Sequence, residues 1–403
     1  MNRRPHILHL MVDQQRADTL AALGNSVIRT PHLDRLAHEG VSFIRAYSPC
    51  PVCVPARASM IHGQHPHHTG CYENCCANPA IAVHERQTFM HALTGAGYRT
   101  HGVGKCHFMP DRDALRGFQS RRSQEAGYGP PESNDYARWL DDQGLPYIGD
   151  PAGVGSEMYY VPQLAPVPAS HHPTQWVADE SIRFLQQQAD DPDQPWYLYT
   201  SFLHPHPPFS PPYPWHTHYT PSRMPLPRVP QDHASLLTYV NRVQNRYKGI
   251  DCGINQNLIQ CVIAYYYACI SFIDHQIGRL LETLEQTGQL DDTLIVFTSD
   301  HGEFLGDYHS YGKRSFLDAS ARVPMLLRWP DLGVAGQRCD VPVSLIDLAP
   351  TFTEAGKASV TSHELDGESL LAAATGGPRR PYVFGQHAYT HHVDGSAARH
   401  VDV

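Results

Sequence analysis

The chain has 403 residues, which is enough for one large α/β domain or for two domains of ordinary size. Its net charge of −9 argues against a nucleic-acid-binding protein, because such proteins usually carry a basic surface patch. No stretch approaches the roughly 18 consecutive apolar residues of a membrane span. Ten cysteines in a chain of this length do not indicate a disulfide scaffold.

The N-terminal segment predicts a buried strand. Residues 6–13 are an apolar run that ends in Asp13, as a central parallel strand does when it presents a ligand at its carboxyl end. The run is interrupted by His9 and has no cleavage-like site, so it does not have the pattern of a signal peptide. We therefore expect a cytoplasmic protein whose fold begins with this strand.

Strands and helices alternate along the rest of the chain. This alternation predicts an α/β fold with a mostly parallel central sheet and helices on both faces. Two segments rich in proline and glycine, 110–172 and 204–232, are expected to be irregular loops. The expected helices are 31–37, 57–63, 87–96, 174–188, 255–287 and 344–355, and the further strands are 41–43, 98–103, 196–202, 293–299 and 323–327.

Acidic residues at strand ends indicate a metal site. Asp13 ends the first strand, and Asp300-His301 follows the strand 293–299. Carboxylate oxygens suit Ca²⁺ or Mg²⁺, and the histidine would also accept Mn²⁺ or Zn²⁺. The alternative is that each aspartate only caps the element that follows it.

Five short segments share their order and approximate spacing with the motifs of one enzyme family. Cys53-x-Pro55-x-Arg57 is the first, and the expected helix after it places Cys53 near a helix N-terminus, which suits an anion. The other four are 104–107, 204–209, 298–306 and 312–324. Over residues 6–355 the chain resembles the formylglycine-dependent sulfatases of the alkaline-phosphatase-like superfamily. It lies close to their arylsulfatase, choline-sulfatase and phosphonate monoester hydrolase branch.

The resemblance implies a sulfuric ester hydrolase whose nucleophile derives from Cys53. A formylglycine-generating enzyme would oxidise this cysteine during maturation, and the hydrate of the aldehyde would attack the sulfur of a small-molecule sulfate ester. His206 or Lys313 would protonate the leaving oxygen, and His107 would act as the base that regenerates the aldehyde. The positive groups expected around the sulfuryl oxygens are Arg57, Lys105, Lys313 and protonated His206.

The resemblance also implies a metal ligand set and one further contact to the substrate. In addition to residue 53, the ligands would be Asp13, Gln14, Asp300 and His301. Ca²⁺ is expected first, with Mn²⁺ or Mg²⁺ as alternatives, because Gln14 replaces the carboxylate that sulfatases usually have. Asn74 matches a substrate-binding asparagine of the phosphonate hydrolase branch.

Three alternatives remain open. The first is a phosphonate or phosphate monoester or diester hydrolase on the same fold, which Gln14 and Asn74 favour, whereas Lys105-x-His107 favours sulfate. The second is an inactive relative that serves as a binding module. The third is a structural zinc protein, although prolines crowd the first pair of its candidate ligands, Cys50, Cys53, Cys71, Cys75 and Cys76.

We expect residues 1–360 to form the catalytic domain and 361–403 to be the start of a truncated C-terminal subdomain, with 382–386 as its first strand. Neither a nucleic acid nor a membrane is expected as a partner, and homo-oligomerisation is left open. The alcohol part of the substrate is not specified by any motif.

Overall fold

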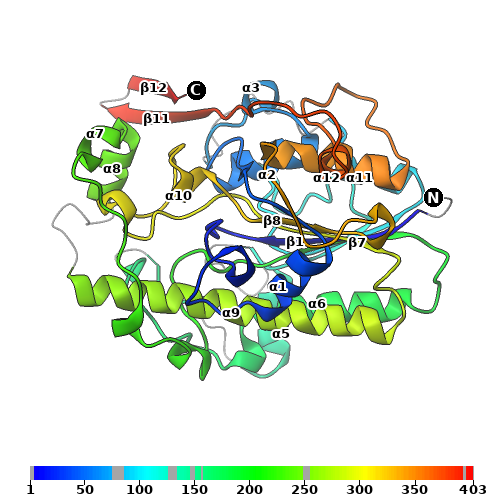
Figure 1. Ribbon diagram of the computed structural model, residues 1–403. Coiled ribbons are helices and arrows are strands. Elements are labelled where there is room, and N and C mark those ends of the chain that lie inside the picture. The colour runs from blue at the N-terminus through cyan, green and yellow to red at the C-terminus, as the bar shows by residue number, and fades with distance from the viewer. Residues whose placement is uncertain are drawn as a thin grey trace.

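An eight-stranded sheet forms the centre of the protein (Figure 1). The computed structural model describes residues 4–74, 86–125, 134–145, 150–155, 158–247, 255–393 and 396–402. The strands lie in the order β5 (Ser120–Ser123), β4 (Arg99–Gly104), β6 (Trp196–Ser201), β1 (His6–Val12), β7 (Thr293–Ser299), β8 (Met325–Arg328), β2 (Val41–Phe43) and β9 (Gln337–Cys339).

The sheet is mostly parallel, which confirms the predicted fold class. β1 pairs in parallel with both β6 and β7, so that Met11 lies beside Ser201 and Val12 beside Ser299. β4 continues the parallel arrangement on the far side of β6, whereas β8 runs antiparallel to β7 and β2. The carboxyl ends of β1, β4, β6 and β7 therefore meet at one edge of the sheet.

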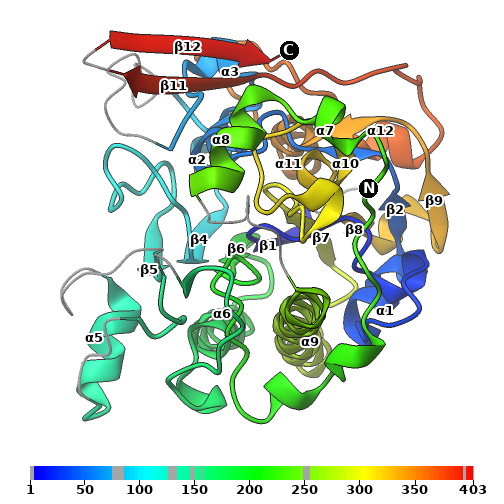
Figure 2. The same ribbon diagram turned by 90° about the vertical axis from the view of Figure 1, so that its left-hand side faces the viewer.

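Helices cover both faces of this sheet (Figures 1 and 2). The side chains of β1 alternate between the two faces: Ile7 and Met11 belong to one core cluster, and Leu8 and Leu10 to the other. One face is covered by α1 (Pro31–Glu39), α5 (Asp135–Asp142), α6 (Pro173–Gln188) and α9 (Gln256–Gln286), and the other by α2 (Cys53–His62), α4 (Phe89–Gly95), α11 (Leu348–Gly356) and α12 (Leu370–Ala374).

Short elements connect these layers. The remaining helices are α3 (Pro66–Thr69), α7 (His233–Leu236), α8 (Tyr239–Tyr247) and α10 (Asp318–Ala321), and the remaining strands are β3 (Ala46–Tyr47), β10 (Val343–Ser344), β11 (His387–Val393) and β12 (Ser396–Asp402). Single 3₁₀ turns cover 21–23, 169–171, 215–217, 221–223, 307–309, 330–332 and 345–347.

The long helix α9 is a core element. Among the described residues it is the one helix whose length and composition would allow it to cross a membrane. In the structure 67% of that apolar window is buried, and Ile273, Ile277 and Leu280 pack in the core beneath the sheet. The apolar surface of α9 is therefore largely buried against other parts of the protein.

Three predicted elements differ in the structure. The helix expected from residue 57 already begins at Cys53, because Pro55 lies in the first helical turn, where a missing N–H breaks no helical hydrogen bond. The segment 110–172 contains β5 and α5 besides its loops, and the N-terminus of α5 is capped by Asn134. Residues 382–386 are not a strand; β11 begins one residue later and forms an antiparallel hairpin with β12.

Candidate active site

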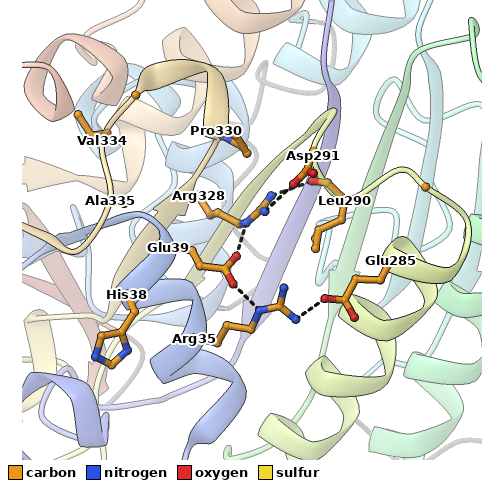
Figure 3. A pocket seen from close by; sticks show the side chains of 12 residues that line it. Arg35, His38, Glu39, Glu285, Leu290, Asp291, Arg328, Pro330, Val334 and Ala335 are labelled. Atoms are coloured by element: carbon orange, nitrogen blue, oxygen red, sulfur yellow. Dashed lines mark hydrogen bonds and ion pairs between the residues drawn. The ribbon is translucent and has the colours of Figure 1, made fainter.

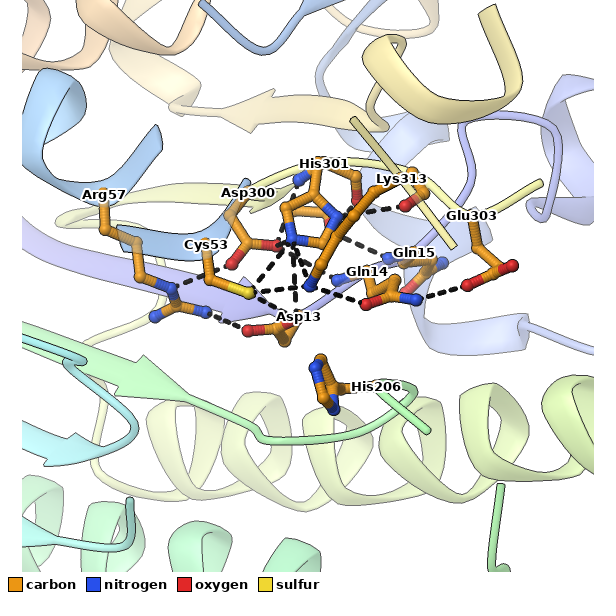
Figure 4. A network of polar contacts seen from close by, with 12 residues as sticks. Asp13, Gln14, Gln15, Cys53, Arg57, His206, Asp300, His301, Glu303 and Lys313 are labelled. Carbon is orange, nitrogen blue, oxygen red and sulfur yellow. Dashed lines mark hydrogen bonds and ion pairs between the residues drawn. The ribbon is translucent and has the colours of Figure 1, made fainter. Parts of the chain in front are cut away.

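A compact buried cluster lies where β1, β7 and α2 meet (Figure 4). Ligand atoms of Asp13, Cys53, Asp300 and His301 all lie within 4.8 Å of one another. Each of these residues is at most 1% exposed. The structure thus brings together residues that are almost 300 positions apart in the sequence, as the strand-end pattern predicts.

The Cys53 thiol is surrounded by polar groups. Its Sγ lies 2.8 Å from Lys313 Nζ, 3.3 Å from His301 Nε2 and 3.7 Å from Asp13 Oδ1. Burial alone would raise the pKa of this thiol, but the positive charges of Lys313 and Lys105 outweigh burial and lower the pKa well below its usual value. The position of Cys53 is therefore one that stabilises a negatively charged atom.

Gln14 also belongs to the cluster. Its backbone N–H donates to Asp300 Oδ1 at 3.0 Å, and its carbonyl oxygen accepts from Tyr266 at 2.8 Å. These two bonds stabilise a backbone with φ of +68°, which is uncommon for a residue other than glycine. The side-chain oxygen Oε1 accepts from Lys313 at 2.8 Å.

The donor set fits a divalent cation. Three carboxylate or amide residues and one imidazole offer the oxygen and nitrogen atoms that Ca²⁺, Mg²⁺ or Mn²⁺ prefer. In addition, the ammonium of Lys313 lies within 3.1 Å of acceptor atoms on Gln14, Cys53 and His301. Three of the five predicted ligands thus already surround a positive charge.

Arg57 lies behind these ligands and contacts protein groups. Its side chain is 1% exposed and forms ion pairs with Asp300 at 2.9 Å and with Asp13 at 3.3 Å. Its Nη1 donates to the carbonyl oxygen of Lys105 and to the hydroxyl groups of Tyr199 and Ser201, at 2.7–3.1 Å. In this structure Arg57 orients the two aspartates and connects α2 to β4 and β6.

Lys105 lies directly after β4 and is fully buried. Its Nζ is 2.6 Å from Asp13 Oδ2. Burial opposes both charges, yet the pKa of Lys105 is raised by Asp13 and that of Asp13 is lowered by Lys105, so both stay ionised. Gly104 makes this position possible, because a Cβ there would lie 2.0 Å from the Ser201 carbonyl oxygen.

His107 and Asn74 lie on either side of the start of α2. The backbone N–H of His107 donates to both carboxylate oxygens of Glu125, and its buried Nδ1 has no hydrogen-bond partner among the described residues. Its side chain is one of the groups that lower the pKa of the Cys53 thiol. Asn74 Oδ1 accepts from the backbone N–H of Val54 at 3.0 Å, so in this structure Asn74 caps the first turn of α2.

His206 faces Asp13 from the loop after β6 (Figure 4). Its Nδ1 lies 2.7 Å from the Pro207 carbonyl oxygen, and its Nε2 lies 3.1 Å from the Tyr159 hydroxyl. Burial lowers the pKa of His206 to about 4. Burial therefore disfavours the protonated form of His206 that the resemblance implies, and that expectation stays a prediction.

His204, the less favoured histidine of the same segment, lies elsewhere. Its ring nitrogens contact Ser210 and Thr174, and it packs beside His172. These contacts belong to the packing between the loop and α6.

The described residues do not form a four-thiolate zinc site. Cys53 groups with carboxylates and an imidazole, and this is the one His, Cys, Asp and Glu cluster with metal-ligand spacing in the described part of the chain. The Sγ atoms of Cys50 and Cys71 each lie 4.0 Å from a backbone carbonyl oxygen. Cys75 and Cys76 lie outside the described residues.

A separate cavity of about 750 Å³ lies between α1, the end of α9 and the segment after β8 (Figure 3). Its charged side chains are already paired with one another. Arg35 bonds to Glu39 and Glu285, and Arg328 bonds to Glu39 and Asp291, at 2.6–3.0 Å. Because its charged side chains are paired with one another and it holds none of the motif residues, this cavity is not the candidate active site.

Two residues that the motifs do not single out also contact the site. Tyr159 bonds to His206, and Glu303 bonds to the side-chain amide of Gln14. Glu303 lies within the motif segment 298–306, so the sequence could have indicated that it lies near the site. For Tyr159 the sequence offered no such indication.

Taken together, the sheet and the cluster at its carboxyl edge define a hydrolase of the alkaline-phosphatase-like type. The chain belongs to the sulfatase family, since the Sulfatase family model matches residues 5–358. It is 32% identical to an arylsulfatase of Clostridium perfringens, over 96% of this chain and 82% of that protein. It is 31% identical to a choline-sulfatase of Rhizobium meliloti, over 96% of this chain and 74% of that protein.

Solved structures support the same fold. A phosphonate monoester hydrolase of Agrobacterium radiobacter matches with a TM-score of 0.81 and 28% identity, covering 97% of this chain and 82% of that chain. A phosphonate monoester hydrolase from Silicibacter pomeroyi also has a TM-score of 0.81, at 27% identity, over 97% and 81% of the two chains.

Proposed function

We propose that this protein hydrolyses sulfate monoesters of small molecules to an alcohol and inorganic sulfate. It would use a formylglycine formed from Cys53 and one bound divalent cation, Ca²⁺ first and Mn²⁺ or Mg²⁺ as alternatives. The observation that carries the proposal is the position of Cys53 Sγ, which lies 2.8 Å from Lys313 Nζ inside the cluster of Asp13, Asp300 and His301. Membership of the sulfatase family supports it.

The two absent groups would have distinct tasks. Formylglycine hydrate supplies an oxygen nucleophile, and a divalent cation supplies Lewis-acid chemistry. Asp13, Gln14, Asp300 and His301, together with residue 53, would hold the cation. A formylglycine-generating enzyme would be the maturation partner, and the cytoplasm the compartment.

The lysines supply positive charge for an anionic ester. Lys105 and Lys313 are both buried and both lower the pKa of the Cys53 thiol, and electrostatic stabilisation is strong here because water is excluded. Lys313 is the better candidate for protonating the leaving oxygen, because it has protons to give. A neutral His206 whose Nδ1–H donates to Pro207 would have only an acceptor at Nε2.

His107 would serve as the base. Its side chain hydrogen-bonds to Cys53, which brings the imidazole to the residue that would carry the hydrate. The contact of its backbone N–H with Glu125 fixes the loop that carries it. A proton-accepting role at the start of α2 is consistent with this placement.

A second candidate is phosphonate monoester hydrolysis. The Asp13-Gln14 pair and the match to two phosphonate monoester hydrolase structures favour it. The same buried positive charges would bind a phosphonate oxygen, so the choice of ester separates the two candidates.

The test is a panel of sulfate, phosphate and phosphonate esters, assayed with protein co-expressed with a formylglycine-generating enzyme. Mass spectrometry of the Cys53 peptide should show aldehyde in place of thiol, and sulfate monoesters should be the fastest substrates. Cys53→Ser should fold but lose repeated turnover. An active protein with an unmodified thiol, or faster phosphonate than sulfate hydrolysis, would contradict the proposal.

A further inference from the structure

Glu303 is a buried carboxylate that no step of the proposed chemistry uses. It is 0% exposed and lies two residues after His301. Four hydrogen-bond donors contact its two oxygens. They are Gln14 Nε2 and the Tyr160 hydroxyl at 3.1 Å on Oε2, and the backbone N–H groups of Leu305 at 2.9 Å and of Gly312 on Oε1.

The contact with Gln14 decides which end of that amide faces the active site. Gln14 Oε1 accepts from the Lys313 ammonium at 2.8 Å, while Gln14 Nε2 donates to Glu303 (Figure 4). If the amide were reversed, its NH₂ group would face an ammonium and its oxygen would face a carboxylate. Both contacts would then be repulsive, so Glu303 and Lys313 together select one orientation.

A second contact connects Glu303 to Lys313. The N–H of Gly312, the residue before Lys313, donates to Glu303 Oε1, and Phe304 N–H donates to the Gly312 carbonyl oxygen at 2.8 Å. Gly312 has φ of +87°, which suits glycine. Glu303 thus fixes the start of the segment that brings Lys313 to Gln14.

We infer that Glu303 is a positioning residue that makes Gln14 present its oxygen, and not its nitrogen, to the cation site. Glu303 also supplies a negative charge behind Gln14. An acidic residue at position 14 would supply the same charge in direct contact with the cation. This inference rests on the proposed divalent cation. Outer contacts of this kind orient metal ligands and adjust the charge around the metal.

The inference predicts that exchanging the two residues preserves the site. In Glu303→Gln the oxygen of the new side chain accepts hydrogen bonds from the backbone N–H groups of Leu305 and Gly312. Its NH₂ group then points toward Gln14 and needs an oxygen there as acceptor. Residue 303 would then draw the oxygen of Gln14 away from the cation site while Lys313 holds it there, and this competition would weaken Gln14 as a ligand. In the double variant Gln14→Glu, Glu303→Gln, the NH₂ of residue 303 donates to one carboxylate oxygen of residue 14 and leaves the other oxygen for the cation.

The experiment measures the binding of Ca²⁺ and Mn²⁺ alone to the metal-free full chain by calorimetry. Glu303→Gln should weaken binding about 10-fold or more, the usual loss for such an outer contact. The double variant should recover most of this loss. Gln14→Glu alone keeps both carboxylates beside the cation site and should bind at least as tightly as the wild type, because it adds one negative charge. Glu180→Gln removes another buried carboxylate, paired with Arg122 and Arg183, and should leave the affinity unchanged.

Wild-type affinity in Glu303→Gln, or a double variant that binds no better than Glu303→Gln, would overturn the inference. If Glu303→Gln does not fold, the comparison of the double variant with the wild type decides, and an affinity weaker by about 10-fold or more would overturn the inference. A wild-type protein that binds no divalent cation would instead refute the metal in the proposed function, and the inference with it. The ester panel is independent of all these measurements.

Discussion

At the scale of single residues, Lys313 is the side chain with the most direct contacts to the site. Its ammonium bonds to Gln14, Cys53 and His301. Replacing it with alanine should lower kcat/KM for a sulfate ester by about 10²-fold or more, the usual scale for a lost electrostatic or general-acid group. The loss should be smaller for nitrophenyl sulfate than for an alkyl sulfate, because nitrophenolate leaves without a proton.

The matched control for this prediction is Lys357, an exposed lysine at the end of α11. The backbone at Lys357 has a φ of +50°, which asparagine tolerates. Lys357→Asn should therefore leave kcat/KM unchanged. Wild-type kinetics of Lys313→Ala on the alkyl ester would show that the ammonium takes no part in the chemistry.

At the scale of elements, the N-terminus of α2 depends on Asn74. The Asn74 side chain accepts from the N–H of Val54, next to Cys53. Asn74→Ala should lower the free energy of unfolding by about 1 kcal/mol, as loss of a helix cap does, and should also reduce kcat/KM because residue 53 shifts with the helix. Urea denaturation and steady-state kinetics measure the two effects.

Asn134 gives the comparison for that prediction, since its side chain caps α5 through the Ala137 N–H at 2.8 Å. Asn134→Ala should cost a similar free energy of unfolding without changing kcat/KM. If Asn74→Ala and Asn134→Ala have the same kinetics, the cap on α2 has no role in placing residue 53.

The elements also show which structural features could be predicted from the sequence and which could not. The strand β1 and the ligand Asp13 were predictable because an apolar run that ends in a carboxylate is a local pattern. The predicted start of α2 at residue 57 is four residues late, because Pro55 lies in the first turn, where a proline costs no hydrogen bond. The role of Glu303 was not predictable, because it depends on Gln14, from the other end of the chain.

At the scale of the whole molecule, buried histidines should make the fold sensitive to acid. Burial is the main cause that lowers each of their pKa values from 6.5, to about 3 for His9, His62 and His387 and to about 4 for His101, His204 and His206. Between pH 6.5 and about 4 the unfolded chain therefore binds protons that the folded chain does not. The free energy of unfolding should fall as the pH decreases through this window.

Three buried carboxylates among the described residues act in the opposite direction. Burial raises the pKa of Asp274 to about 7 and also raises the pKa values of Asp300 and Asp347, so these groups contribute stability at low pH that is lost as the pH rises. The six histidines outnumber them. Urea midpoints measured from pH 7.5 down to pH 4.5 should therefore decrease, and less steeply in His101→Gln than in the exposed-site control His38→Gln. A midpoint that does not change over this range would contradict the prediction.

The central position of β1 has a consequence for the time course of biosynthesis. β1 pairs with β6 and β7, so this strand waits for partners that are translated much later. At roughly 5–20 residues per second, translation takes on the order of ten seconds or more to pass from Cys53 to the end of β7. During this interval the Cys53 peptide is open to a modifying enzyme, whereas in the finished fold the residue is 1% exposed. Under the proposed maturation, oxidation of Cys53 would compete with folding, and slower elongation should raise the fraction of protein that carries the aldehyde.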